Sequence, residues 1–584
     1  MTEDTTLPPA ETSAPGAIPR WLVRLSQPGR MAWLAPLIAL VLTLPSVLSG
    51  YTQDDHVFRQ SSLETTIFPR RAAWDYFHWV DSPAEIARFR ERGIQQVTWW
   101  TPDTARSRFL RPLSSLLHAF EFNCFGDAPW LMHVICALLY AAIVFLGVKL
   151  LARFSSTAAA AGIACLLFAV DDAHAYSAGW ISSNNTLLTF AFGLFALLMH
   201  DRWRREKSVL GLVLSLAGLV FSLLSSEGGL ALIGYLAAYA LFLDSGSWHK
   251  RIATLVPAAL VAVGYLIFYF TQGLGIRGSF DWLSPTEDLV QTALVVLSGA
   301  ATGTIAQVSS IPMLALLLQG AGIWGPIAAA LLLAALAALF WRFLRSSRRV
   351  GFFAAGMVLS LVPFSVGMMG DRYLLWAGLG GAGLMAELFA VWATTSRLQR
   401  VVARALLVTQ VHVSAIVFVP TLFWLAAIEN NIRKTERMVA AQDTVMLNGS
   451  TIADNASAGL RYEKQGQWPE HFYHLYEGMD ALTVKRVGER TLLMTPANGW
   501  FATSWISRGA RPKELVFGQG QVFEMELMTA KIEKMMPDGR PRSVSFAFKK
   551  DLSELAWLAM TFDGPSAFQV PAPGEEVVVA LWGR

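Results

Sequence analysis

The chain has 584 residues, of which 54% are hydrophobic and only 15% are charged. Soluble proteins average about 25% charged residues, and here the apolar residues gather in runs of about 20, the length of a helix that crosses a bilayer core. The 47 basic and 43 acidic residues leave a net charge of +4, which does not indicate a nucleic-acid partner. The composition therefore excludes an ordinary soluble domain and predicts an α-helical multispanning membrane protein.

In chain order, residues 1–30 come first, and their Pro, Thr, Ala and Glu content predicts a disordered cytoplasmic tail. Residues 31–428 follow as a predicted transmembrane domain of about eleven helices. The apolar runs lie near 31–50, 130–151, 156–170, 180–199, 208–224, 228–243, 252–271, 322–341, 351–369, 373–393 and 403–427. A further apolar segment, 288–319, is interrupted by Gly299, Gly303 and Pro312, so we expect it to lie in the interface or to re-enter the membrane without crossing it.

The basic residues predict the orientation of the helices. Clusters such as "HDRWRREK" (200–207) and "WRFLRSSRR" (341–349) flank the apolar runs. Short basic loops stay in the cytoplasm, and all the clusters fall on that side if 288–319 crosses zero times or twice. The N-terminus is then cytoplasmic, and the large loop 51–129 and the region after 428 are extracytoplasmic. We expect a bacterial inner membrane, with the last region in the periplasm.

Residues 429–584 predict a second, mostly β domain on the extracytoplasmic side. The segments 491–495, 514–518, 521–528, 543–548 and 576–582 are rich in strand-forming residues and are bounded by Gly, Pro and Asp turns. No run in this region is long enough to cross a membrane.

Charged residues recur where the predicted helices reach the extracytoplasmic side. The candidates are Asp54, Asp55 and His56 in "GYTQDDHVFR" (50–59), Arg111 before the second span, Asp171, Asp172 and His174 in "AVDDAHAYS" (169–177), Glu227, Asp371 and Arg372. For any one of these, a solvated helix end or an N-cap explains the charge equally well. The recurrence at several helix ends favours one shared site, because ionisable groups at membrane depth are expensive.

These residue types predict group transfer from a phospholipid-linked donor. A carboxylate such as Asp54 or Asp55 can remove a proton from an acceptor, and the same pair is a candidate site for a divalent metal ion. Arg372 or Arg111 can hold a phosphate leaving group. Trp99, Trp100 and Trp282 could stack on sugar rings, but an interfacial aromatic belt is the favoured interpretation.

Five segments resemble the GT-C superfamily of polyprenol-phosphate-dependent glycosyltransferases, especially the O-mannosyltransferases with tetratricopeptide repeats. They are "GYTQDDHVF" (50–58), "FLRPLSSLLHAFEFNCFGDAPWLMHVICALLYA" (109–141), "FAVDDAHAYSAGWISSNNTLLTFAF" (168–192), "LLSSEGGLALIGYL" (223–236) and "GDRYLLWAGLG" (370–380). The chain departs from the family where Ser226 replaces a lysine, where Asp371 replaces a glutamate, and in lacking the repeats.

The resemblance implies a GT-C-like fold and an inverting transfer of a hexose or pentose from a polyprenyl-phosphate donor. It implies that Asp54 is the catalytic or acceptor-orienting carboxylate, with Asp55 supporting it or binding a metal, and that Arg372 contacts the donor phosphate, while the choice between Asp54 and Asp55 as the base stays open. His174 and Glu227 become further site candidates. The acceptor, a protein, lipid or glycan, is not specified.

Two rival functions remain open at this point. A transporter or flippase of lipid-linked sugars would show inverted repeats and charged sites near the bilayer midplane, neither of which is evident. A non-catalytic envelope-assembly protein on the same scaffold would not need the carboxylate of Asp54.

Overall fold

The computed structural model describes most of the chain. The described residues are 27–63, 70–93, 97–277, 289–321, 323–367, 369–392, 395–439, 442–449, 469–478, 480–501, 516–561 and 563–580. The predicted tail, except for its last four residues, and Trp282 lie outside them.

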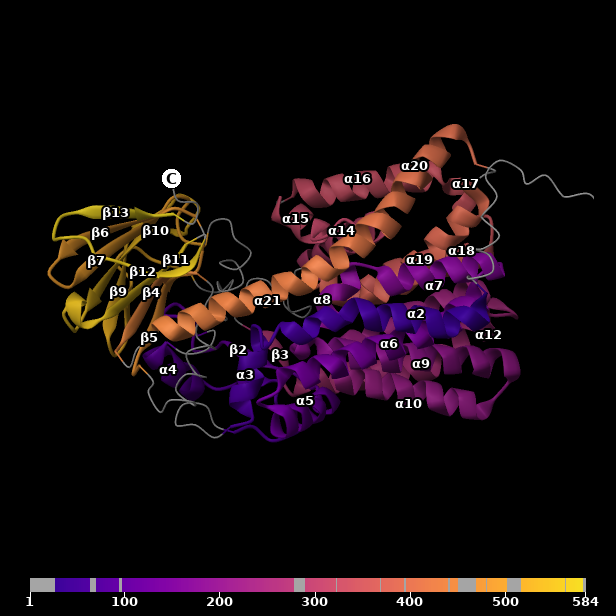
Figure 1. The fold of residues 1–584 in the computed structure, drawn as a ribbon, viewed down its shortest axis with the longest axis horizontal. Helices are drawn as coiled ribbons and strands as arrows, with labels where there is room; N and C mark the ends of the chain where they lie inside the picture. The colour runs from indigo at the N-terminus through magenta and orange to yellow at the C-terminus, as the bar shows by residue number, and fades with distance from the viewer. Residues whose placement is uncertain are drawn as a thin grey trace, which may run out of the picture.

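A helical part and a β part follow one another along the chain, and helix α21 runs from the first into the second (Figure 1). The long helices are α2 (Pro28–Thr43), α6 (Pro129–Phe154), α7 (Ala158–Val170), α9 (Asn184–Glu206), α10 (Val209–Ser225), α11 (Ala231–Ala238), α13 (Val256–Thr271), α14 (Leu289–Ser309), α16 (Trp324–Leu339), α18 (Arg348–Leu361), α19 (Leu375–Val391), α20 (Arg397–Leu407) and α21 (Ser414–Met438). Short helices join them: α8 (Ala173–Gly179), α12 (Trp248–Ala253), α15 (Leu314–Gly320) and α17 (Trp341–Leu344).

A helix coincides with each of the eleven predicted apolar runs. Among the described residues, five helical segments are long and apolar enough to cross a membrane, and α7 with α8 makes a sixth if this pair, bent by 52°, is one span. The chain is therefore an integral membrane protein. The figure of eleven crossings and the orientation stay predictions.

The predicted interruption of 288–319 by glycine is wrong for its first part, because α14 is one continuous helix of 21 residues. Its glycines serve close packing. A Cβ on Gly299 would come within 2.7 Å of Ser365, and one on Gly303 within 3.2 Å of Leu361. The helix ends at Ser309, three residues before Pro312, which cannot continue a helix.

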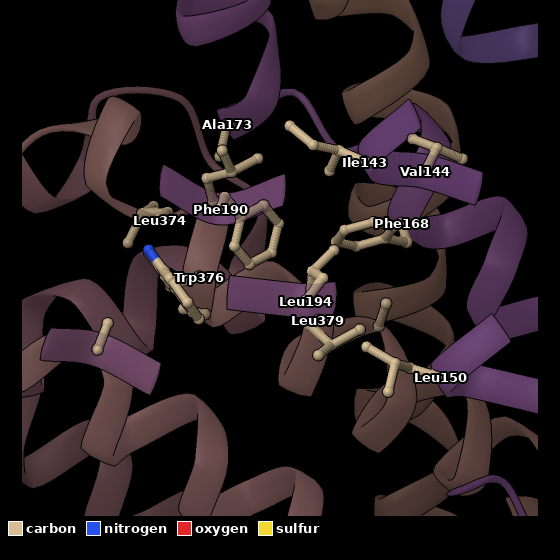
Figure 2. Packing of buried hydrophobic residues seen from close by; sticks show 14 of the residues in the cluster. Ile143, Val144, Leu150, Phe168, Ala173, Phe190, Leu194, Leu374, Trp376 and Leu379 are labelled. Atoms are coloured by element: carbon tan, nitrogen blue, oxygen red, sulfur yellow. The ribbon is translucent and has the colours of Figure 1, made fainter. Parts of the chain in front are cut away.

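Helix α19 lies at the centre of the helical part, and its residues from Leu375 to Phe389 are all buried. Figure 2 shows Phe168, Phe190 and Trp376 filling the space between neighbouring helices. The rings of Phe190 and Trp376 meet edge to face at 4.8 Å, an arrangement that aromatic pairs prefer. Arg372 immediately precedes this rigid helix, so its backbone is held firmly.

The segment between α2 and α6 contains α3 (Asp54–Ser61), α4 (Pro83–Arg92) and α5 (Pro112–Phe125). Strand β1 (His78–Val80) pairs with β2 (Arg106–Arg108), which pairs in turn with β3 (Gly275–Arg277), a strand from far along the chain. Ser82 caps α4 by accepting a hydrogen bond from Glu85 N.

The β part contains two sheets with a shared core. The six-stranded sheet has the order β13-β6-β7-β10-β9-β8, and the four-stranded sheet has the order β12-β11-β4-β5. The strands are β4 (Thr444–Asn448), β5 (Phe472–Tyr476), β6 (Leu482–Gly488), β7 (Thr491–Pro496), β8 (Val522–Glu524), β9 (Met528–Met535), β10 (Pro541–Phe548), β11 (Ala556–Thr561), β12 (Gly564–Ala567) and β13 (Glu576–Val579). The strand predicted at 514–518 is absent from its described residues, 516–518.

Trp99 and Trp100 lie in the core of the β part, so the prediction of an interfacial belt is wrong for both. Their side chains are at most 2% exposed, and they pack among the buried residues of the two sheets. The indole Nε1 of Trp99 donates a hydrogen bond of 3.0 Å to Leu475 O. The first large loop therefore supplies part of this core and is fixed to it.

Candidate active site

The acidic pair begins helix α3 immediately after a strained turn. Gln53 has a φ of +48°, a conformation that side-chain-bearing residues rarely adopt, and Gly50 has a φ of +73°. Strain of this kind persists only where the surrounding structure imposes it, and it is concentrated at functional sites. Here the turn directs two adjacent carboxylates into different surroundings.

Asp55 is buried and fully engaged with the protein. Its Oδ2 accepts a hydrogen bond of 2.9 Å from Thr52 N, and its Oδ1 accepts one of 2.7 Å from Ser182 N and a second, very short one from the Ser182 hydroxyl. These contacts tie the turn before α3 to the segment between α8 and α9. Asp55 has the surroundings of a structural carboxylate.

Asp54 has different surroundings. It is only partly buried, and none of the described residues forms a hydrogen bond or an ion pair with its carboxylate. Burial raises the pKa of Asp54 to about 6, against the opposing influence of the guanidinium groups of Arg372 and Arg111. Both guanidinium groups therefore influence this carboxylate electrostatically, without a direct contact to it among the described residues.

Arg372 lies in the short 3₁₀ turn Asp371–Tyr373, before α19. Its guanidinium donates a hydrogen bond of 2.5 Å to Tyr373 Oη and lies 4.7 Å from the centre of that ring and 5.9 Å from the ring of Trp180. Among the described residues, no carboxylate lies within 4.0 Å of it. This partly buried cation is held by aromatic rings and its charge is not neutralised by direct contact.

Arg111 is held by an ion pair. Its Nε donates a hydrogen bond of 2.9 Å to Glu227 Oε2, and a terminal nitrogen makes a shorter one to Oε1. The guanidinium also lies 4.3 Å from the ring centre of Phe109 and 4.8 Å from that of Phe77. Glu227 thus neutralises Arg111, which leaves Arg372 as the less compensated of the two predicted phosphate contacts.

Asp171, Asp172 and His174 lie at the bend between α7 and α8, where each has a partner within the protein. Asp171 Oδ2 accepts a hydrogen bond of 2.7 Å from Gln307, and Asp172 Oδ1 accepts one of 2.8 Å from Ser414. All three are buried, and the Nδ1 of His174 lies 3.1 Å from Tyr140 Oη. These contacts secure the bend and join it to α14 and α21.

Asp371 is engaged by the backbone of Met313, and no ion pair with its neighbour Arg372 is formed among the described residues. Its Oδ2 accepts a hydrogen bond of 2.8 Å from Met313 N, whereas Oδ1 is buried without a hydrogen-bond partner among the described residues. Burial raises the pKa of Asp371, partly opposed by the bond from Met313. Asp371 thereby fixes the turn that carries Arg372.

His56 connects the first loop to helix α21. Its Nε2 lies 3.0 Å from Glu429 Oε2, and the other oxygen of Glu429 accepts a hydrogen bond of 2.6 Å from Arg433. His56 and Glu429 are both buried. This contact connects α3 with the helix that enters the β part.

Three residues that contact candidate site residues or their neighbours were not predicted from the sequence: Tyr176, which contacts Gln53, Tyr373, which contacts Arg372, and Glu429, which contacts His56. Tyr176 Oη accepts a hydrogen bond of 3.4 Å from Gln53, and its neighbours include Asp54 and Arg372. Tyr373 adjoins Arg372 in the sequence, so the "DRY" triplet carried a local signal for it. Glu429 carried none, because it is 373 residues from its partner.

The fold is that of an integral membrane protein whose candidate site includes a carboxylate in α3, Asp54, and a guanidinium in the turn before α19, Arg372. No protein-family model and no curated protein sequence matches the chain. Among solved structures, it is similar to a crystal structure of ArnT from Cupriavidus metallidurans bound to undecaprenyl phosphate. The match has 12% identity and a TM-score of 0.35, and it covers 76% of this chain and 89% of that one. At this level of similarity, the function has to be argued from the chain's own residues.

Proposed function

We propose that the protein is a membrane glycosyltransferase that moves a sugar from a polyprenyl-phosphate donor to an acceptor on the extracytoplasmic face. The observation that carries the proposal is an unengaged carboxylate, Asp54, within the electrostatic influence of a cation, Arg372, that no carboxylate of the described residues contacts. Such a pair supplies a base and a phosphate contact within one site. The five segments that resemble GT-C enzymes support the same reading.

In the proposed reaction, an acceptor hydroxyl attacks the anomeric carbon of the donor sugar. The oxygen forms the new glycosidic bond as its O–H bond breaks, and Asp54 takes the proton. The bond between the anomeric carbon and the phosphate oxygen breaks, and its electron pair leaves with the polyprenyl phosphate. Attack opposite the leaving group inverts the anomeric centre.

The surroundings of Asp54 suit the role of base. With a pKa of about 6 it is mostly ionised at neutral pH, yet it holds a proton more strongly than an ordinary aspartate does. Catalytic bases work best when their pKa lies near the operating pH. Asp55, whose oxygens accept three hydrogen bonds, is proposed to position α3.

Arg372 is proposed to bind the phosphate leaving group. A guanidinium matches the geometry of a phosphate and stabilises the negative charge that develops as the sugar departs. Tyr373 and Trp180 hold its orientation without neutralising it. Arg111, whose charge Glu227 neutralises, is proposed to support the site as part of this ion pair and to be secondary to Arg372 as a phosphate contact.

The proposed localisation is a bacterial inner membrane, with the site on the periplasmic side. The polyprenyl chain would lie against the apolar helices, where many large side chains are exposed on the surface. A divalent ion at the acidic pair stays a proposal for Asp54 only, because protein donors already occupy both oxygens of Asp55.

Envelope glycan profiling by mass spectrometry tests the proposal. A strain lacking the protein is compared with strains restored with the wild type, with Asp54→Asn and with Asp127→Asn, at equal membrane levels. Asp127 is a matched control, because its side chain is 97% exposed in the same loop. We expect a glycan to lose one sugar in the null and Asp54→Asn strains and to regain it with the other two. Full restoration by Asp54→Asn would reject the proposed base and favour a transporter or an assembly role.

A further inference from the structure

The two main groups of the proposed site come from distant parts of the chain, and one short segment contacts the backbone around both. Asp54 begins α3 after the strained turn at Gln53, and Arg372 lies in the turn before α19. The segment 176–182, at the end of α8 and just after it, forms hydrogen bonds with both turns. Within this segment, Trp180 makes a contact on each side.

The indole of Trp180 holds the turn that leads into α3. Its Nε1 donates a hydrogen bond of 3.2 Å to Thr52 O, and the same carbonyl accepts a bond of 3.0 Å from Asp55 N in the first turn of the helix. Trp180 is 3% exposed, and Thr52 is completely buried. A buried hydrogen bond is costly to break, because water does not replace the lost partner. The backbone two residues before Asp54 is therefore fixed by a side chain from another element.

The ring of Trp180 also meets the guanidinium of Arg372. The central carbon of the guanidinium lies over this ring, 5.9 Å from its centre, within the range at which a cation is attracted to an aromatic ring. Ser177 Oγ donates a hydrogen bond of 3.4 Å to Arg372 O. The guanidinium and the backbone of Arg372 are thus both contacted from the segment 176–182.

Tyr176 supports the indole of Trp180. The two rings meet edge to face, with their centres 5.3 Å apart, an arrangement that aromatic pairs prefer. Tyr176 Oη also accepts a hydrogen bond of 3.4 Å from Gln53, in the turn before Asp54. Because the indole is packed in this way, it cannot reorient without breaking its contact to that turn or to Arg372.

We propose that Trp180 is a positioning residue that sets the distance between the base and the phosphate contact. The inference rests on the proposed transferase function and adds to it a residue that acts through Thr52 and Arg372. The N–H of the indole fixes the turn that carries Asp54, and the ring fixes the guanidinium. A misplacement of about 1 Å can lower a rate by about 100-fold. Loss of the N–H should therefore slow the transfer more than it weakens binding of the lipid phosphate.

Two substitutions separate the two contacts of Trp180. Trp180→Phe keeps an aromatic ring for Arg372 and removes the N–H that Thr52 O accepts, whereas Trp180→Leu removes both. The matched control is Trp557→Phe, because Trp557 is also buried and its Nε1 donates a hydrogen bond of 2.7 Å to Leu552 O within the β part. Each variant is expressed from an inducible promoter in the strain that lacks the protein, at equal membrane levels.

Two quantities are measured for the wild type and for each variant. The first is the rate at which the missing sugar returns to the envelope glycan after induction, followed by mass spectrometry. The second is the dissociation constant of undecaprenyl phosphate, measured by native mass spectrometry on the purified protein in detergent. The melting temperature of the same preparations reports any loss of folding stability.

We expect Trp180→Phe to slow the return of the sugar by about tenfold or more and to change the dissociation constant by less than about twofold. Trp180→Leu should slow the return further and weaken undecaprenyl phosphate binding by about threefold or more. Trp557→Phe should leave both quantities unchanged, although its melting temperature should also fall.

The result for the wild type separates failure of the inference from failure of the proposed function. If the wild type restores no sugar to the null strain, the transferase function is wrong, and the role of Trp180 is wrong with it. If the wild type restores the sugar and Trp180→Phe does so as fast as Trp557→Phe, only the role of Trp180 is overturned. The same holds if the rate and the binding fall equally in Trp180→Phe, because a purely structural residue would affect both.

Discussion

Replacing Asp54 with asparagine should abolish activity and, at neutral pH, stabilise the protein. The physical reason is the unengaged state of the carboxylate, which is partly buried without a hydrogen bond or ion pair from the described residues. Asparagine keeps the shape and removes the charge, so it removes the cost of burying that charge. A functional group held at the expense of stability is a common feature of active sites.

The size of the expected stabilisation follows from the pKa of Asp54. Burial raises the pKa of Asp54 from 3.8 to about 6, and each tenfold change in proton affinity corresponds to about 1.4 kcal/mol. The folded state binds this proton more tightly than the unfolded state does, so ionisation destabilises the fold. The penalty is absent below pH 3.8, grows up to pH 6 and is complete above it, at up to about 3 kcal/mol.

The assay is thermal unfolding in detergent at pH 4 and pH 8, combined with activity in the same preparations. We expect Asp54→Asn to melt above the wild type at pH 8 and close to it at pH 4. Asp55→Asn is the contrasting variant, because an amide side chain cannot accept all three hydrogen bonds that the Asp55 carboxylate accepts. This substitution should destabilise the protein by about 1–3 kcal/mol. An Asp54→Asn variant that melts below the wild type at pH 8, or shows the same shift at both pH values, would refute the reasoning.

Further predictions concern the base, the phosphate contact and the loop contacts. The transfer rate should fall as the pH drops through about 6, where Asp54 becomes protonated. A pH–rate profile in which the rate falls only near pH 4 would contradict this pKa. In steady-state assays, Arg372→Ala should lower kcat by about 100-fold, and Arg372→Lys, which keeps the positive charge, should lower it by less. Equal losses of kcat in the two variants would mean that the charge has no role. Trp99→Ala should destabilise the β part by about 3–5 kcal/mol, measured by limited proteolysis against the wild type. Glu429→Gln should weaken the contact to His56 and lower both the melting temperature and kcat, whereas unchanged values would mean that this contact does not position α3.

The sequence by itself determined the positions of the helices and the main groups of the candidate site. Apolar runs of the right length predict helices because a helix satisfies its own backbone hydrogen bonds, and a helix was found at each of the eleven runs. The acidic pair after the first span was recognisable from its place in the chain. Short segments in which apolar and polar residues alternate predicted part of the β region. This alternation is also a local property of the sequence, because successive side chains of a strand point to opposite faces of the sheet.

Only the tertiary structure decided how these groups are used. It distinguished Asp54 from Asp55, although they are neighbours, because Ser182 engages one and not the other. It paired Arg111 with Glu227 and placed Trp99 in the core of the β part instead of at a membrane surface. These outcomes depend on partners more than 100 residues away in the sequence. Local periodicity carries no information about which distant side chain will satisfy a buried charge or cover a buried ring.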